Sequence, residues 1–164
     1  MLATRSMEIT TKGGVVAFRC STSGVIEYLL VKTTGGIGYT PPKGSLERAD
    51  HGSTLACARR ELEEETGLND TTVQFLANGE GVFVSIEANP YTDRRNVTIR
   101  TTYYLALVAS DAAITRNEQE IEDARWFSLC EACEHFAEVR WSDSMTPLLR
   151  QAHSLAQVHL RETS

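Results

Sequence analysis

Apolar and polar positions alternate in short blocks along the chain, and this pattern predicts a series of strands. The blocks are rich in β-branched and aromatic residues and are bounded by glycine, proline, asparagine or aspartate, which is typical of strands. We expect strands at residues 13–18, 25–32, 73–76, 82–86, 97–108 and 121–127. The glycine-rich stretch 33–38 and the polar stretch 87–96 are predicted loops.

Three other segments have helical spacing. We expect helices at residues 54–66, 129–137 and about 145–160. In the first of these, Leu55, Ala58 and Leu62 recur at intervals of three and four and would form an inward stripe. Ser53 suits the N-cap position and Gly67 the C-cap position.

Alternation of strands with a few helices predicts an α/β fold, in which helices cover both faces of a central mixed β-sheet as an α/β/α sandwich. The 164 residues suit one domain, which we expect to span residues 8–164. Residues 1–7 carry little structural signal and are predicted to be a disordered lead-in.

Charge and composition restrict the function classes. The net charge of −6 argues against an extended nucleic-acid surface, and no apolar run approaches the roughly 18 residues of a membrane span. We therefore expect a cytoplasmic monomer acting on a small molecule, with a mitochondrial location left open. A polyphosphate substrate would be repelled unless metal ions and local bases such as Lys43 reversed the field.

The four cysteines include a Cys-x-x-Cys pair, Cys130 and Cys133. This spacing is compatible with zinc or redox chemistry. No second pair has ligand spacing, however, and the segment reads as a helix, so we expect reduced structural cysteines.

The most informative segment is the acidic end of the first predicted helix. Glu61, Glu64 and Glu65 stand at i, i+3 and i+4, so their Cβ atoms would lie about 5–6 Å apart on one face. The alternative is a solvated acidic face. We favour a metal site, because the three glutamates lie beside the apolar stripe and carboxylate oxygens are the ligands that Mg²⁺ and Mn²⁺ prefer.

This segment resembles the signature of the Nudix hydrolases, which is glycine, five residues, glutamate, seven residues, then Arg-Glu-hydrophobic-x-Glu-Glu-x-Gly-hydrophobic. The second half matches at Arg60, Glu61, Leu62, Glu64, Glu65, Gly67 and Leu68. The first half starts at Gly44 but is two residues longer than the family pattern. Asp50 and Glu47 are therefore both candidates for the first acidic position.

Three further stretches are similar to the asymmetric diadenosine tetraphosphate hydrolases of this family. They are residues 27–44, which end in Thr-Pro-Pro-Lys-Gly, residues 101–106, and residues 118–133. The resemblance implies a Nudix-type fold and Mg²⁺-dependent hydrolysis of a dinucleoside polyphosphate to ATP and AMP, with Mn²⁺ as a possible substitute ion. A diphosphoinositol polyphosphate or capped-RNA pyrophosphohydrolase and a non-catalytic nucleotide-binding module are the alternatives.

The resemblance also implies roles for single residues. Glu61, Glu64 and Glu65 would bind the metal, with a carbonyl of Gly44 or Lys43 as a further ligand. Arg60 would orient Glu61.

Outside the helix the roles are less constrained. Glu120 would activate the attacking water, with Glu118 and Glu122 as rivals. Lys43 would contact a phosphate, whereas Tyr39 and Tyr103 could stack on adenine or pack in the core.

Overall fold

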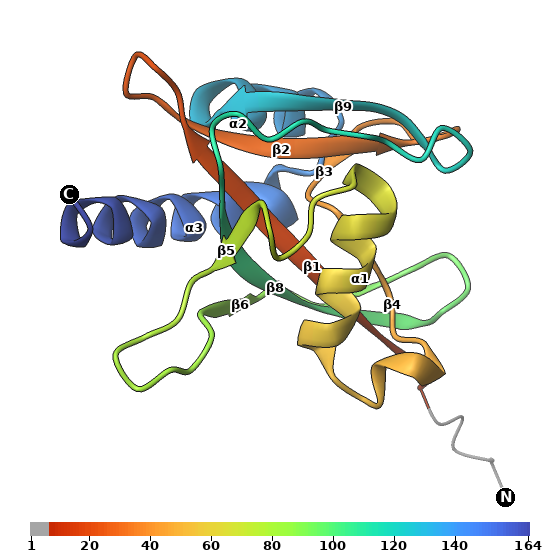
Figure 1. The fold of residues 1–164 in the computed structure, drawn as a ribbon. Coiled ribbons are helices and arrows are strands. Elements are labelled where there is room, and N and C mark those ends of the chain that lie inside the picture. Colours follow the sequence, from red (N-terminus) through yellow and green to blue (C-terminus); the bar gives the residue numbers. More distant parts are fainter. Residues whose placement is uncertain (1–6) are drawn as a thin grey trace, which may run out of the picture.

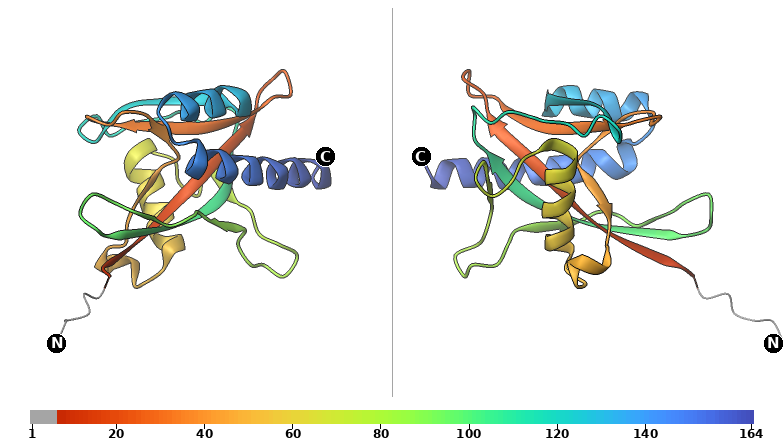
Figure 2. Two further views of the ribbon diagram at one scale, coloured as in Figure 1. Left: turned by 180° about the vertical axis from the view of Figure 1, so that it is seen from behind. Right: turned by 45° about the vertical axis from the view of Figure 1, so that its right-hand side comes forward.

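The computed structural model describes residues 7–164 and is organised around a strongly curled nine-stranded sheet (Figures 1 and 2). The strands are β1 (Ile9–Cys20), β2 (Ile26–Thr33), β3 (Tyr39–Thr40), β4 (Lys43–Ser45), β5 (Val73–Phe75), β6 (Ser85–Glu87), β7 (Tyr91–Thr92), β8 (Thr98–Val108) and β9 (Ile121–Ser128). The helices are the 3₁₀ turn η1 (Arg48–Asp50), α1 (Thr54–Thr66), α2 (Leu129–Glu138) and α3 (Ser142–Glu162).

Strand pairing makes the sheet mixed, as the sequence predicts. The main path runs β3-β2-β1-β8-β5, with β9 beside β2, β4 beside β1, and β6 and β7 beside β8. The two longest strands, β1 and β8, run parallel and register Ile9 with Thr98 through Phe18 with Leu107. Every other pairing is antiparallel.

Two apolar clusters cover the two faces of the sheet, which confirms the predicted sandwich. On one face, Phe18 and Tyr103 pack with Phe136 of α2 and Leu149 of α3. On the other, the apolar side of α1 packs against alternate residues of β1 and β8. Figure 1 shows α1 crossing one side of the sheet and α2 and α3 lying on the other side.

Helix α1 has the predicted bounds and caps. The Ser53 hydroxyl accepts a hydrogen bond from the Ala56 amide at 3.1 Å, and Gly67 ends the helix with a φ of 74°. The helix lies very close to β1, because a Cβ atom added to Gly13 would stand 2.4 Å from the Thr54 carbonyl oxygen. The absence of a side chain at Gly13 therefore sets the distance between helix and sheet.

Two predicted elements have different bounds. Helix α3 begins at Ser142, before the predicted start near Met145, because the Trp141 carbonyl accepts the Met145 amide at 2.8 Å and begins the first turn. The strand predicted at 82–86 is only partly formed. Residues 85 and 86 belong to β6, whereas the residues before them form one side of a turn, in which the Asn78 side chain accepts the Val82 amide at 3.0 Å.

The remaining predicted strands and helix α2 are confirmed to within a few residues. Of the predicted lead-in, residues 1–6 lie outside the described part of the chain. Within residues 7–164, no helix has the length and apolar composition needed to cross a bilayer.

We predict that Gly13→Ala lowers the free energy of unfolding by about 1–3 kcal/mol, because the added methyl group overpacks the contact between α1 and β1. Urea denaturation followed by circular dichroism measures this. Gly79→Ala is the matched control, since a Cβ atom at Gly79 meets nothing within 4 Å. Equal losses in the two variants would show that the close approach at Gly13 is unimportant.

Candidate active site

The three glutamates predicted to bind metal, Glu61, Glu64 and Glu65, form one edge of α1, which we call the acidic edge. Glu61 and Glu65 are buried, and the Glu61 side chain is 12% exposed, whereas the Glu64 side chain is 46% exposed. Their positions beside the buried Leu62 agree with the helical spacing read from the sequence. The cluster is therefore not a fully solvated acidic face.

Strand β4 lies directly against one of these carboxylates. A Cβ atom on Gly44 would stand 2.1 Å from the Glu61 carboxyl group, so only glycine fits there. The missing side chain brings the β4 backbone next to Glu61, and the Gly44 carbonyl accepts the Cys57 thiol at 3.3 Å. All four cysteines, Cys57 among them, are free thiols.

Arg60 joins the acidic residues of the loop to those of the helix. Its Nε and Nη2 donate to the two oxygens of Asp50 at 3.1 and 2.8 Å. Its Nη1 donates to Glu61 at 2.9 Å and to Glu64 at 3.3 Å. The bidentate pair with Arg60 lowers the pKa of the buried Asp50 carboxyl to about 2, so this group stays ionised.

The geometry separates the two candidates for the first acidic position of the signature. Asp50 is buried and holds Arg60 with both oxygens, whereas the Glu47 side chain is 60% exposed and reaches Arg60 once, at 3.3 Å. Asp50 also stands at the family spacing from Gly44. The two additional residues therefore follow Asp50, where His51 and Gly52 both have positive φ angles.

Glu65 is a buried carboxylate whose oxygens are not both hydrogen-bonded within the described residues. Its Oε2 atom has no hydrogen-bond partner in the described residues. Burial, together with the charges of Glu61 and Glu120, raises its pKa to about 8, although Lys43 opposes this shift. Burial likewise raises the pKa of Glu61. An additional positive charge at this place would keep both groups ionised.

The donor set therefore suits a divalent cation, since it combines several carboxylates with one unpartnered buried oxygen. Among residues 7–164, no three acidic, histidine or cysteine side chains converge closely enough to enclose an ion. Glu64 accepts a hydrogen bond from Arg60 Nη1 at 3.3 Å. Nudix hydrolases generally use a divalent metal ion.

The candidate water-activating residues lie in the turn before β9 and at the start of that strand. Glu120 is exposed at the end of a turn, its carbonyl accepts the Thr34 amide at 2.9 Å, and its charge contributes to the raised pKa of Glu65. The rival Glu122 is paired with Lys32 at 3.1 Å. Glu120 therefore has an electrostatic link to Glu65 on the acidic edge of α1.

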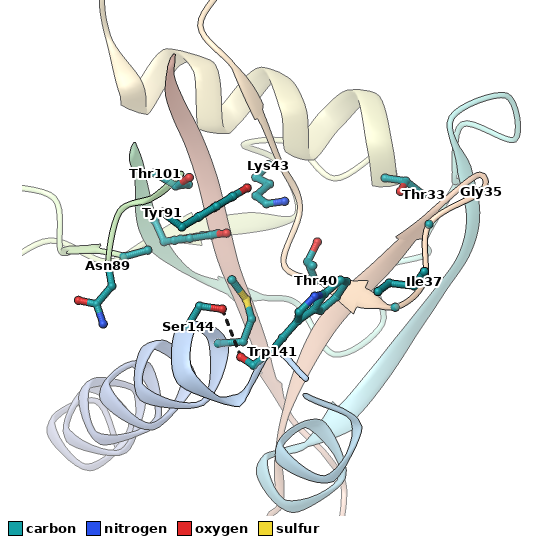
Figure 3. Close-up of a pocket in the computed structure, with 15 residues that line it drawn as sticks. Thr33, Gly35, Ile37, Thr40, Lys43, Asn89, Tyr91, Thr101, Trp141 and Ser144 are labelled. Carbon is teal, nitrogen blue, oxygen red and sulfur yellow. Dashed lines mark hydrogen bonds between the residues drawn. The ribbon is translucent and has the colours of Figure 1, made fainter. Parts of the chain in front are cut away.

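A cavity of about 610 Å³ opens beside Lys43 (Figure 3). Lys43 links this cavity to the acidic edge, because its side chain lines the cavity and its charge acts on Glu65. Burial and the nearby charge of Lys12 lower the pKa of Lys43 to about 8. The other walls come from the β2–β3 loop, the β6–β7 segment, β8 and the start of α3, as Ile37, Asn89, Tyr91, Thr101 and Trp141 illustrate in Figure 3.

The two tyrosines considered for base stacking are placed differently. Tyr39 does not line the cavity, because its hydroxyl donates to Asp123 at 2.7 Å and its ring packs against Phe127 and below Arg125. Tyr103 lines the cavity but is only 1% exposed, so neither ring face is free for a base.

Sequence reasoning missed the exposed or half-buried apolar side chains of the cavity. Tyr91 is exposed within a segment predicted to be a loop, and Trp141 lies in the short connection between two helices. In the sequence, the pattern that could have identified them is an isolated aromatic residue within a polar connecting segment. An exposed aromatic residue such as Tyr91 is a candidate for ligand contact.

The chain is similar to known proteins over most of its length. Residues 11–149 match the NUDIX domain. The bis(5'-nucleosyl)-tetraphosphatase [asymmetrical] of Rattus norvegicus is 34% identical over 110 residues, covering 66% of this chain and 69% of the relative. The protein of the same name from Mus musculus is 33% identical over 113 residues, covering 68% and 71%.

The fold has solved counterparts as well. The crystal structure of a C. elegans Ap4A hydrolase binary complex superposes with a TM-score of 0.72 at 18% identity, covering 92% of this chain and 98% of that chain. The family match spans most of the chain and includes α1, Arg60 and the glutamates that follow it. The chain therefore belongs to the NUDIX domain family and is a Nudix hydrolase.

Proposed function

We propose that this protein is a Mg²⁺-dependent pyrophosphohydrolase that splits bis(5'-nucleosyl) tetraphosphates asymmetrically, giving ATP and AMP from diadenosine tetraphosphate. The observation that carries the proposal is the continuity between the acidic edge of α1 and the cavity, which meet at Lys43. The relatives named above support the choice of substrate.

We assign the role of each residue in the reaction from its position in the site. Glu61, Glu64 and Glu65 would hold the metal together with the Gly44 carbonyl, and Arg60 would keep the Glu61 carboxylate oriented towards β4. Bound Mg²⁺ would supply positive charge to neutralise the phosphate oxygens as charge develops. Asp50 would hold Arg60 in place through its two hydrogen bonds.

In the reaction, a water oxygen attacks phosphorus while the bond to the bridging oxygen on its far side breaks. Glu120 accepts the proton that the water loses, because it lies close enough to influence Glu65 and is exposed to solvent. Lys43 stabilises the negative charge of the phosphate chain. Tyr91 and Trp141, which are accessible on the cavity wall, provide contacts for a nucleoside.

The test of the substrate is a panel of dinucleoside polyphosphates, diphosphoinositol polyphosphates, capped RNA and nucleotide sugars, with products identified by mass. We expect ATP and AMP from diadenosine tetraphosphate with the highest kcat/KM of the panel. A higher value for any other class would replace the proposed substrate.

We predict that Glu64→Gln lowers kcat by a factor on the order of 10²–10³, because a metal ligand contributes several kcal/mol to catalysis. The fold should be retained, since Glu64 is largely exposed and its i,i+4 pair with Arg60 is worth only a few tenths of a kcal/mol. Glu63→Gln is the matched control on the same helix, with the same loss of charge at an exposed position. Near-normal turnover of Glu64→Gln would remove this residue from the metal site.

We further predict that a chelator abolishes turnover without unfolding the protein, and that added Mg²⁺ restores it. Circular dichroism before and after chelation, alongside the rate assay, checks both points. Full activity after exhaustive chelation is the outcome that contradicts a metal-dependent mechanism.

A third prediction concerns the positioning of Arg60. Asp50→Asn should raise the Mg²⁺ concentration needed for half-maximal rate by about 10–100-fold, because outer-shell partners of metal ligands contribute at this level. Glu47→Gln should change it little, since Glu47 reaches Arg60 once from an exposed position. Titration of the rate with Mg²⁺ compares the variants, and equal effects would mean that Asp50 has no special role.

A further inference from the structure

Two of the three lysines in the chain, Lys12 and Lys43, lie on the same face of the sheet. In the antiparallel ladder of β1 and β4, Lys12 pairs with Ser45 and Lys43 pairs with Gly14. The two lysines are therefore diagonal neighbours, which are typically about 7–8 Å apart and point to the same side. Two ammonium groups are thus brought together in a chain of net charge −6.

Neither of these lysines has a carboxylate partner. Across residues 7–164, the ion pairs within 4.0 Å involve neither Lys12 nor Lys43. The remaining lysine, Lys32, is paired with Glu122 at 3.1 Å. Like charges placed side by side repel, and an anion between them removes the conflict.

Strand β8 adds a neutral donor beside the two lysines. In the parallel ladder, Thr101 lies opposite Lys12 and Tyr103 lies opposite Gly14, and both β8 residues line the cavity (Figure 3 labels Thr101). The Tyr103 ring occupies the space that a side chain at Gly14 would need, since a Cβ atom there would be 2.6 Å from Tyr103 Cε1.

The Tyr103 hydroxyl is buried and has no hydrogen-bond partner in the described residues. Buried hydroxyl groups are normally paired, so an unpaired one on a cavity wall indicates that its acceptor is a ligand. A phosphate oxygen satisfies this donor and both ammonium groups together, because it accepts several hydrogen bonds and carries negative charge.

We propose that Lys12 joins Lys43 and Tyr103 in an anion subsite on the sheet face, which holds the phosphate groups of the substrate that lie away from α1. This inference rests on the proposed function and names the residue that favours longer polyphosphate chains. A longer chain reaches from the acidic edge past Lys43 to Lys12. A shorter chain ends at Lys43 and gains nothing from Lys12.

The test compares the wild type with Lys12→Gln, which removes the charge from a half-buried strand residue. We expect KM for diadenosine pentaphosphate to rise about tenfold, as for loss of one charge-assisted contact, with kcat unchanged. KM for diadenosine triphosphate should change less than about twofold. Lys12→Arg should retain the wild-type preference, and Lys32→Gln is the matched control with the same charge change away from the subsite. A uniform KM change across chain lengths would overturn the proposal.

A second measurement is independent of turnover. Isothermal titration of inorganic pentapolyphosphate, with Mg²⁺ present and its integrity checked by ³¹P NMR, should give about tenfold weaker binding to Lys12→Gln than to wild type. Equal binding would overturn the subsite whatever the enzyme hydrolyses. Lys12-dependent binding without hydrolysis of any dinucleoside polyphosphate would support the subsite and refute the proposed function.

Tyr103→Phe separates a ligand contact from a packing role. Removal of an unpartnered buried hydroxyl should leave the melting temperature unchanged or raise it. Pentapolyphosphate affinity should nevertheless fall severalfold. Unchanged affinity would show that Tyr103 only packs in the core and would remove it from the subsite.

Discussion

The close contact between α1 and the strands beneath it is the constraint on which the active site depends. Gly13 lets the start of the helix touch β1, and Gly44 lets β4 lie against the Glu61 carboxyl group. The contact buries two carboxylates that would otherwise be solvated, and burial raises the pKa of both Glu61 and Glu65. The helix therefore carries acidic groups whose ionised forms require nearby positive charge.

The side chains of the protein supply only part of the positive charge that Glu61 and Glu65 require. Arg60 donates a hydrogen bond to Glu61 and another to Asp50. In contrast, one oxygen of the Glu65 carboxylate has no hydrogen-bond partner in the described residues. On the other side of β4 the imbalance is reversed, because Lys12 and Lys43 are neighbours and neither forms an ion pair within residues 7–164. A ligand that joins bound cations to a chain of phosphates complements both halves at once.

The sequence predicts α1 and the long strands because their signals are local. The Ser53 and Gly67 caps and the spacing of Ala58 and Leu62 determine α1 without tertiary information. Strands β3, β4 and β7 are only two or three residues long and exist because longer neighbours pair with them, so no periodic pattern reveals them. The cavity walls likewise depend on loops such as the one carrying Tyr91, whose position is set by pairing with β8.

Sequence spacing alone also does not distinguish Asp50 from Glu47 as the first acidic residue of the signature, because the distinction depends on the conformation of the turn that follows. His51 and Gly52 take left-handed conformations, with φ angles of 50° and 76°, and reverse the chain between Asp50 and the start of α1. The two additional residues are thereby accommodated at the exposed end of the loop while Asp50 stays buried on Arg60. The longer loop leaves the hydrogen bonds of Arg60 to Asp50 and Glu61 intact and does not line the cavity, whose walls come from the β2–β3 loop, the β6–β7 segment, β8 and the start of α3.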